Sequence, residues 1–354
     1  MSSILVVNAG STSLKLNVVA PDETTTPLST LEEADPAGIA AVAHRVVHGG
    51  STLRQPVVID EEVRDAIFEL RSLAPLHNAP ALAGIATAER ALPDAVHVAV
   101  FDTAFHSTMP EEAALYAVPR RWRDEWGVRR YGFHGLSVAW SAQRAPQLLD
   151  RSSAGLRLVV CHLGGGSSVT AVRDGRSVDT TMGFSPLEGV PMTTRAGSID
   201  PGALLYLLGT RRQGREAIDH ALNFESGLKA VAGGSGAMLE LEERFARGDE
   251  HAGLAIAVFA HRVAGAIAAM ATAAGGLDAV VFTAGIGEGS ALVRERVCER
   301  LGFLGLRIDT HANAAAEPDA DVAARRSAAR ILVIRAREEL VAARAARRLL
   351  RPET

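Results

Sequence analysis

The sequence predicts an α/β protein made of two similar domains. Short apolar runs typical of strands alternate with longer segments that have helical spacing, and this alternation is typical of α/β architecture. A strand–turn–strand pattern at 4–19 returns at 158–172, about 155 residues later and close to half of the 354-residue chain. One repeat at half the chain length favours two related domains that face each other, since solenoids and propellers repeat at shorter periods.

Length and composition fit two domains with their own cores. The 354 residues include 47% hydrophobic and 22% charged residues, which is ordinary for a globular protein. The formal net charge of −4 argues against nucleic acid as the main partner, because binding to a phosphate backbone needs a basic surplus. Cys161 and Cys298 lie in apolar runs without CxxC spacing, which predicts two buried thiols and a reducing cytoplasm rather than zinc or disulfides.

The sequence predicts neither a signal peptide nor a membrane anchor. Residues 1–7 lack the charged region and the long apolar stretch of a signal peptide. Leu254–Gly276 is the most apolar long segment, but His261 and Arg262 interrupt it. We therefore predict a buried helix there rather than a membrane span.

The first half of the chain mixes strands and helices. Short apolar runs predict strands at 4–7, 14–19 and 96–100. Helical spacing predicts helices at 61–73, at 119–126 and from 136 onward. Residues 76–78 lie between Pro75 and Pro80 and are predicted to form a loop, because proline interrupts helices.

The second half repeats this mixture. Strands are predicted at 158–163, 169–172 and 279–282, and helices at 202–208, 254–274, 291–301 and 337–350. Residues 283–289 are predicted to be a glycine-rich turn before a helix. The helix at 337–350 carries a charged face and is predicted to be a solvated surface helix. Ser152–Ser153 is the candidate domain boundary.

Three glycine-rich turns are candidate phosphate sites. Such turns gather backbone N–H groups around a small space, and hydroxyls and a lysine add donors and charge. Asn8–Lys15 has all of these features, and Lys15 alternates in phase with Ser13. A second copy stands at Gly164–Ser168, and a third at Gly285–Gly289 precedes a helix whose N-terminus also favours anions. An ordinary hairpin explains one such turn alone, but three together favour phosphate binding.

Charged side chains inside apolar segments are candidate catalytic groups. Arg45 lies within what is otherwise a strand, His134 stands between two glycines, and Arg195 ends a Gly/Pro-rich loop. Arginine suits carboxylates and phosphates because its planar fork donates two parallel hydrogen bonds. Asp102 ends a strand, a common place for metal or catalytic work. The alternative for each arginine is an ordinary surface residue, and the alternative for Asp102 is a structural cap.

Together these motifs resemble the acetate kinase family, the acetokinases, within the fold group of sugar kinases, Hsp70 and actin. The resemblance covers nearly the whole chain. Its carriers are Asn8–Lys15, AHRVVHGG at Ala43–Gly50, LAPLHN at Leu73–Asn78, FDTAFH at Phe101–His106, RRYGFHG at Arg129–Gly135, HLGGGSS at His162–Ser168, MGFSPLEG at Met182–Gly189, TRAGSIDPG at Thr194–Gly202, FTAGIGEGSALVRE at Phe282–Glu295 and EEL at Glu338–Leu340.

The resemblance implies a duplicated two-domain fold of the actin, Hsp70 and sugar-kinase type, which is ribonuclease H-like, with the active site in the cleft. Residues 1–150, joined by the C-terminal helix 338–354, would form the acyl and phosphate domain, and residues 151–337 the nucleotide-binding domain. It also implies reversible transfer of the γ-phosphate of ATP to acetate, giving acetyl phosphate and ADP, with Mg²⁺ or Mn²⁺. The implied partner is a second copy in a homodimer.

Roles come from the same resemblance, position by position. Asp102, His134 and Arg195 match the catalytic residues, and Arg45 would bind the substrate carboxylate. The pocket for the acyl methyl group would consist of Val47, Leu76, Phe133 and Pro186. The metal contacts would be Asn8 and Glu338. The nucleotide would meet Lys15, His162, Leu163, Gly164, Gly165, Gly166, Gly285, Ile286, Gly287, Glu288 and Gly289.

Physical chemistry limits what these residues must do. A carboxylate acceptor with a pKa near ~4–5 is already ionised at neutral pH, so the reaction needs no strong base. We therefore expect Asp102 to orient Mg²⁺ or its water rather than to remove a proton. By the resemblance, Arg195 would bind the carboxylate or the phosphoryl group, and this role fits a reaction in which two anions must be brought together.

Several positions on the phosphoryl-donor side depart from the family pattern. Gly165 stands where HLGNG has asparagine, and Gly289 where GIGEN has it. Ala237 and Leu239 stand where SDMR has aspartate and arginine, and Ala336 opens a segment that is usually TNEE. The acyl-side positions match. The alternatives are therefore a propionate or short-acyl kinase, the same chemistry with pyrophosphate or another donor, and a nucleotide-binding regulator without catalysis.

Overall fold

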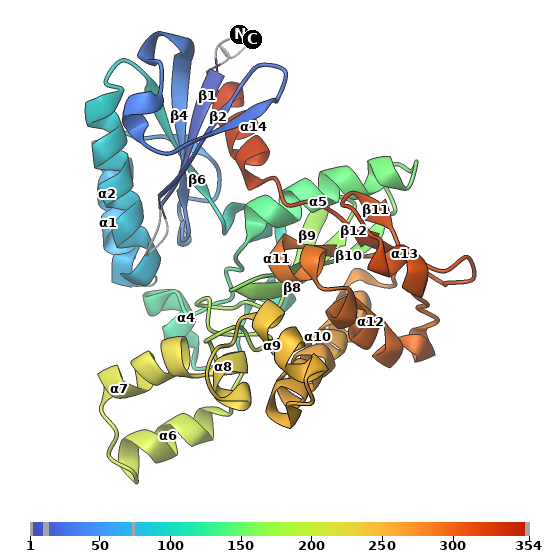
Figure 1. Cartoon of the computed structure of the whole chain (residues 1–354). Coiled ribbons are helices and arrows are strands. Elements are labelled where there is room, and N and C mark those ends of the chain that lie inside the picture. The colour runs from blue at the N-terminus through green and yellow to red at the C-terminus, as the bar shows by residue number, and fades with distance from the viewer. Residues whose placement is uncertain (1–2, 10–13, 73–74, 351–354) are drawn as a thin grey trace.

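The computed structural model describes residues 3–9, 14–72 and 75–350, without the side chains of 72 and 75–77. Its first half contains a six-stranded sheet with the order β3-β2-β1-β4-β6-β5 (Figure 1). The strands are β1 Ser3–Ala9, β2 Leu14–Val19, β3 Thr25–Leu28, β4 Ile39–Val46, β5 Val57–Val58 and β6 Val96–Phe101. The three central strands β1, β4 and β6 are parallel, so their carboxyl ends meet at one edge.

The second half contains a sheet of the same design. Its order β9-β8-β7-β10-β12-β11 repeats the first sheet strand by strand, with the same parallel and antiparallel neighbours. The strands are β7 Arg157–Leu163, β8 Ser167–Arg173, β9 Arg176–Thr180, β10 Ala279–Thr283, β11 Ala320–Asp321 and β12 Arg330–Val333. The duplicated α/β fold predicted from the sequence is confirmed.

Helices of both halves cover the sheets (Figure 1). The first half contributes α1 Glu61–Glu69, α2 Pro75–Ala91, α3 Glu111–Ala114, α4 Arg120–Trp126 and α5 Gly135–Leu148. The rest are α6 Pro201–Gly209, α7 Arg215–His220, α8 Gly227–Ala232, α9 Met238–Ala246, α10 Glu250–Ala274, α11 Ala284–Gly289, α12 Ala291–Arg300, α13 Thr310–Ala314 and α14 Glu338–Leu349. Short 3-10 turns join several of them, including η4 at Ala104–Thr108.

The C-terminal helix α14 is not the solvated surface helix that we predicted. Its apolar face is buried in a core that also contains Val6 of the first sheet, Val160 of the second sheet and residues of α5. Its charged face is also engaged, because Arg344 pairs with Glu23 at 2.7 Å and Arg347 donates to the β2–β3 turn. Small alanines let the helix approach the sheet closely, so this segment returns to the first half of the fold.

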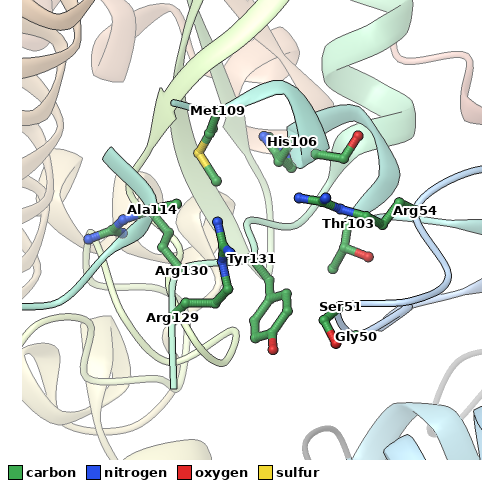
Figure 2. A pocket seen from close by; sticks show the side chains of 11 residues that line it. Gly50, Ser51, Arg54, Thr103, His106, Met109, Ala114, Arg129, Arg130 and Tyr131 are labelled. Atoms are coloured by element: carbon green, nitrogen blue, oxygen red, sulfur yellow. The ribbon is translucent and has the colours of Figure 1, made fainter. Parts of the chain in front are cut away.

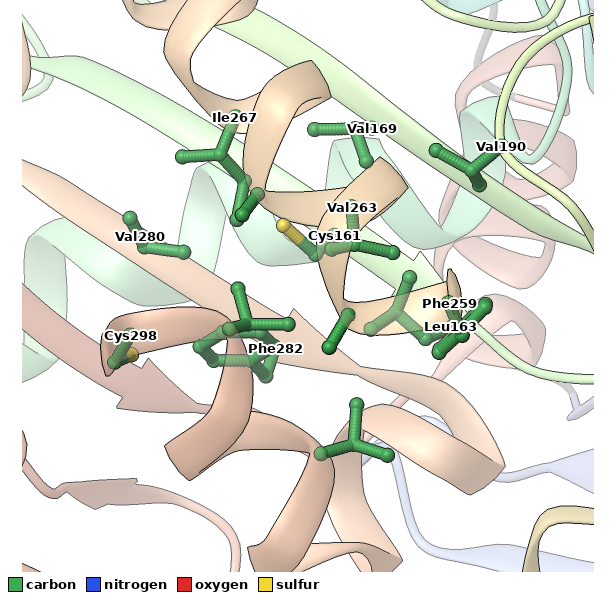
Figure 3. Packing of buried hydrophobic residues seen from close by; sticks show 14 of the residues in the cluster. Cys161, Leu163, Val169, Val190, Phe259, Val263, Ile267, Val280, Phe282 and Cys298 are labelled. Carbon is green, nitrogen blue, oxygen red and sulfur yellow. The ribbon is translucent and has the colours of Figure 1, made fainter. Parts of the chain in front are cut away.

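The helix α10 forms the centre of the second core. By length and composition it could cross a membrane, and it is the only helix of the described residues that could. Its buried residues, including Phe259, Val263 and Ile267, pack against β7 and β10 (Figure 3). Cys161 and Cys298 lie in the same cluster as free thiols, and burial raises the pKa of both. The helix is therefore a core helix, as predicted.

Two local predictions were wrong. Residues 75–78 begin the helix α2 instead of forming a loop, because Pro75 stands at a helix start, where its missing N–H costs nothing. Asn78 then exchanges two hydrogen bonds with the backbone of His48, at 3.2 and 3.1 Å. Residues 284–289 form the short helix α11 rather than an open turn. The Gly10–Ser13 part of the first hairpin and Leu73 lie outside the described residues.

Candidate active site

A cavity of about 350 Å³ lies where the strand ends of the two sheets face each other. Parallel strands place their carboxyl ends at the same edge, which is where ligands bind in open α/β sheets. Seven predicted site residues line this cavity: they are Asn8, Lys15, Arg45, His162, Gly285, Glu288 and Glu338. Asn8 and Lys15 stand directly opposite each other in the β1–β2 register, so their side chains share a face.

Arg45, at the end of β4, is the centre of the polar network. Its Nε donates to Asp102 Oδ1 at 2.9 Å, its Nη2 to Asp102 Oδ2 at 2.5 Å, and its Nη1 to Asn8 Oδ1 at 3.1 Å. Glu338 Oε2 lies 4.0 Å from Arg45 Nε. Burial opposes the charge of the guanidinium, but Asp102 and Glu338 raise the pKa of Arg45 above its ordinary value. The site therefore holds a fixed cation.

Glu338 begins α14 and reaches the same cavity. Burial raises the pKa of the Glu338 carboxyl, and the neighbouring carboxylates of Asp102 and Glu339 raise it further. The cations Arg45 and Lys15 lower this pKa, but they do not cancel the rise. Glu339 also lines the cavity and was not among the predicted site residues. An added cation would relieve the crowding of these three carboxylates.

His134 joins the two halves of the site. It has a φ of 59° at the start of α5, and the next residue, Gly135, donates its N–H to Asp102 O at 2.9 Å. A Cβ at Gly135 would lie 2.0 Å from that oxygen, so the position requires glycine. The turn that presents His134 is thus fastened to the strand end that presents Asp102.

The imidazole of His134 is neutral at physiological pH. Burial lowers the pKa of His134 well below its usual value, and His162, Arg45 and Arg195 lower it further. Its Nδ1 lies 3.0 Å from Ser168 Oγ, and its ring stacks on that of His162 with centroids 4.0 Å apart. Burial also lowers the pKa of His162 to about 4. When Nδ1 accepts from Ser168, Nε2 carries a proton and can donate.

Arg195 lies close to His134, across the glycine turn of the second sheet. A Cβ at Gly166 would lie 3.2 Å from His134 Nε2 and 3.6 Å from Arg195 Nη1, so both side chains approach the backbone of this turn. Burial lowers the pKa of Arg195. Its Nη1 also lies 4.0 Å from the sulfur of Met192. The structure thus brings Arg45, Asp102, His134 and Arg195 together.

An apolar cluster lies beside these charges. It contains Val47 and Phe133, which were predicted, and Met182 and Met192, which were not. Leu76 lies in the first turn of α2, and its side chain is not among those described. Pro186 is half-buried in the loop after β9 and is not part of this cluster. Two methionines in a loop carry no periodic signal, so the sequence alone gave no reason to select them.

The predicted nucleotide residues divide into surface and core positions. Leu163 and Ile286 belong to the second core, so only their backbones can meet a ligand. Among the described residues, a Cβ at Gly165, Gly285 or Gly289 would meet nothing within 4 Å, so these glycines border open space there. By contrast, a Cβ at Gly287 would lie 3.2 Å from the backbone carbonyl carbon of Phe282, and a Cβ at Gly164 would lie 3.7 Å from the Cβ of Ala284. The two glycine-rich turns of the second sheet therefore adjoin each other.

Glu288 fastens this region together. Its Oε1 accepts the N–H of Ala284, at the start of α11, and the N–H of Ala336, before α14, each at 2.9 Å. Its carboxylate thus holds the glycine-rich turn against the segment that leads to Glu338. Within the described residues no group of three or more His, Cys, Asp or Glu side chains could hold a metal ion by itself.

Comparison with known proteins identifies the family. The model of the acetokinase family matches residues 24–344. Proteins named acetate kinase from Nostoc punctiforme and Gloeobacter violaceus are each 48% identical to this chain over 88% of its length, and 78% and 77% of their own lengths are covered.

Solved structures agree with the sequence relatives. A propionate kinase from Francisella tularensis superposes with a TM-score of 0.91 at 35% identity, covering 98% of this chain and 99% of that one. Porphyromonas gingivalis acetate kinase superposes with a TM-score of 0.89 at 32% identity, covering 99% of this chain and 100% of that one. The motif-based prediction of the family is confirmed: the chain belongs to the acetokinase family.

Proposed function

We propose that this chain is an acetate kinase, which transfers the γ-phosphoryl group of ATP reversibly to acetate and gives acetyl phosphate and ADP. One observation carries the proposal: two arginines and a histidine suited to anions converge beside a small apolar cluster. A short carboxylic acid has this combination of a charged head and an apolar methyl group. Membership in the acetokinase family supports the same conclusion.

The residues act on charge rather than on protons. Acetate is ionised at neutral pH, so the barrier is the approach of two anions. In this proposal Arg45 binds the carboxylate, with Asp102 holding its guanidinium in place. Neutral His134 donates from Nε2, and Arg195 supplies positive charge, at the oxygens of the phosphoryl group in transfer. Such preorganised donors lower the barrier because they need no reorientation during the reaction.

The nucleotide side is proposed for the second sheet. Lys15 would meet the phosphates from the first hairpin, and the open glycine turns around Gly165 and Gly285 would admit them. The residues present also fit Mg²⁺. Asn8 Oδ1 and the Glu338 carboxylate offer oxygen ligands in the cavity, and Mg²⁺ characteristically uses one or two such groups plus phosphates and water. When bound, the ion would neutralise charge on the transferred phosphates.

A longer acyl substrate is the second candidate. The similarity to a propionate kinase structure supports it, and so do Met182 and Met192, because unbranched methionine adapts to ligands of different size. The open space at Gly165 and Gly289 likewise keeps a non-ATP donor such as pyrophosphate as an alternative.

Trapping the acyl phosphate as its hydroxamate tests these assignments. The full chain with Mg²⁺ would be assayed with acetate, propionate and butyrate, each against ATP, GTP and pyrophosphate. We expect the highest kcat/KM for acetate with ATP. A preference for propionate or for pyrophosphate would replace the first proposal with the corresponding alternative. No product with any pair would favour a regulator without catalysis.

We also propose that the chain is a cytoplasmic homodimer. Two buried free thiols suit a reducing compartment. The helix α6 has no buried residue, and it exposes Leu205 by 70% and Tyr206 by 52%. An exposed apolar helix favours burial against a second copy. Light scattering should give the mass of two chains, and Leu205→Glu should give one, whereas Phe303→Glu, at an exposed position elsewhere, should remain dimeric.

A further inference from the structure

A second cavity lies outside the cleft and shares no lining residue with it (Figure 2). Its volume is about 110 Å³, which is room for three or four water molecules at ~30 Å³ each. Its walls come from the loop after β4, the turn η4, α3 and the loop between α4 and α5. The space suits an ion of the size of phosphate and is too small for a nucleotide.

Three arginines line this cavity, and no carboxylate does. Figure 2 shows Arg54 on one side and Arg129 and Arg130 on the other, with Tyr131 between them. Arg129 pairs with Glu111 at 3.0 Å and Arg130 with Glu188 at 2.9 Å, both outside the cavity lining. Arg54 is exposed, and its side chain has neither a hydrogen bond nor an ion pair within residues 3–9, 14–72 and 75–350. One guanidinium is therefore left to bind an anion.

The other polar groups of the cavity also favour an anion. Thr103 Oγ1 accepts the N–H of Gly49 at 3.1 Å, and its hydroxyl hydrogen has no acceptor among the described residues, so it can be donated. His106 uses both ring nitrogens, on Ser177 Oγ and Phe133 O, each at 2.9 Å. Burial lowers the pKa of His106 to about 4, so this ring adds no charge at neutral pH. The positive charge comes from arginines, which stay ionised across the physiological range.

We propose that this cavity is a binding site for a small phosphate-bearing anion. Arg54 would grip two oxygens with its planar fork, Thr103 would donate to a third, and Arg129 and Arg130 would add favourable potential. The site adjoins the acyl pocket, because Tyr131 packs against His48 with ring centroids 4.6 Å apart, and His48 packs against Phe133 at 5.4 Å. It is distinct from the cleft in which the kinase reaction is proposed to occur.

Calorimetric titration of the full chain with inorganic phosphate tests the site. The cleft can also bind phosphate, so the comparison is between two variants of equal charge. Arg54→Glu should bind one phosphate fewer per chain than the wild type, or bind that phosphate with an affinity at least about tenfold lower. Arg326→Glu should match the wild type, because Arg326 is exposed and lies outside both cavities. Equal stoichiometry and affinity in the two variants would overturn the proposal.

Two additions keep the test decisive. Arg54→Gln removes the charge without adding a new one, and it should show the same loss if Arg54→Glu proves poorly folded by thermal unfolding. Ethyl phosphate, titrated in parallel, separates the two sources of a phosphate group. Tighter binding of inorganic phosphate identifies the free ion as the ligand, and tighter binding of ethyl phosphate identifies a small phosphate ester.

Discussion

The guanidinium of Arg45 spans both carboxylate oxygens of Asp102, with Nε 2.9 Å from one oxygen and Nη2 2.5 Å from the other. The Asp102 side chain is only 1% exposed, so nearly all of its contact with water has been replaced by this pair. Because an ionised acceptor needs no base, we expect Asp102 to orient Mg²⁺ or its water, which stays a prediction. Its contact with Arg45 indicates a second role, which is to hold the carboxylate-binding arginine.

Removing one partner of this pair should destabilise the protein more than removing both. Arg45→Ala leaves a buried carboxylate without its cation, which typically costs about 3–5 kcal/mol. The partial exposure of Arg45, 20%, should bring the loss toward the lower end. The double variant Arg45→Ala/Asp102→Ala should recover part of that free energy of unfolding. Urea unfolding of the wild type, the two single variants Arg45→Ala and Asp102→Ala, and the double variant measures the coupling energy of the pair. Strictly additive losses of the free energy of unfolding would refute this coupling.

The acyl pocket should widen when a methionine is shortened. Met192 lies in the cluster with Val47 and Phe133. Met192→Ala should raise the ratio of kcat/KM for butyrate to that for acetate by about tenfold or more, since one methylene group is worth ~1–3 kcal/mol in such pockets. The matched control is Met270→Ala, at a buried methionine of the second core. An equal change of the ratio in both variants would show that Met192 does not line the pocket.

Glu288 should act as a positioning residue for the nucleotide. The backbone N–H groups of Ala284 and Ala336 both donate to Glu288 Oε1. A glutamine side chain keeps an oxygen that can accept both hydrogen bonds. Glu288→Gln should therefore keep the KM for ATP within a few-fold, while Glu288→Ala should raise it by about tenfold as the turn at Ala284 loosens. Steady-state kinetics with ATP varied measures both. Equal KM values for ATP in the two variants would indicate that the two hydrogen bonds to Glu288 do not position the nucleotide.

Buried histidines should make the protein sensitive to mild acid. Burial lowers the pKa of His48, His106 and His162 to about 4 and that of His44 to about 3, and it lowers the pKa of His134 as well. The unfolded chain, with pKa values near ~6.5, then binds more protons below that pH. The free energy of unfolding should be nearly flat from pH 7 to 8 and fall as the pH drops from 6.5 toward 4.5.

Urea unfolding at a series of pH values measures this dependence. Each depressed histidine adds up to ~1.4 kcal/mol per pH unit in that window. The Asp278 carboxyl, whose pKa is lowered to about 2 mainly by its hydrogen bond with Arg157, contributes only at more acidic pH. In the window from 6.5 to 4.5 two buried carboxyls with a raised pKa, Glu338 and Glu339, act in the opposite direction, and the predicted net fall comes from the histidines. A stability that rises toward pH 5 would contradict the neutral state assigned to them.

Local patterns predicted those parts of the fold whose signals lie within a few residues. The strands around Asn8 and His162 and the glycine turn at 164–166 follow from apolar runs and turn residues. By contrast, the start of α2 depends on the bonds between Asn78 and His48, which are 30 residues apart. A proline at position 75 is equally compatible with a loop and with the first turn of a helix.

Tertiary contacts decide the rest. The spacing of the arginines in α14 is typical of a solvated helix face, but Arg344 pairs with Glu23, which lies 321 residues earlier in the chain. The edge strand β3 contains Pro27, which weakens any strand signal. Met182 and Met192 reach the apolar cluster of Val47 and Phe133 from the loop after β9, which brings them beside residues more than 45 positions earlier in the chain. Arg45 could be selected as a candidate from the sequence because a charge inside an apolar segment needs a partner or a ligand.

The turnover of Arg195→Ala tests the central claim most directly. Purified wild-type and variant chains would be assayed with saturating ATP, acetate and Mg²⁺ by hydroxamate trapping, with thermal unfolding as the check on folding. If Arg195 stabilises the transferred phosphoryl group, the variant should unfold cooperatively near the wild-type Tm and lose about 10²–10³-fold in kcat. Near-normal turnover in a folded Arg195→Ala variant would contradict the proposed mechanism.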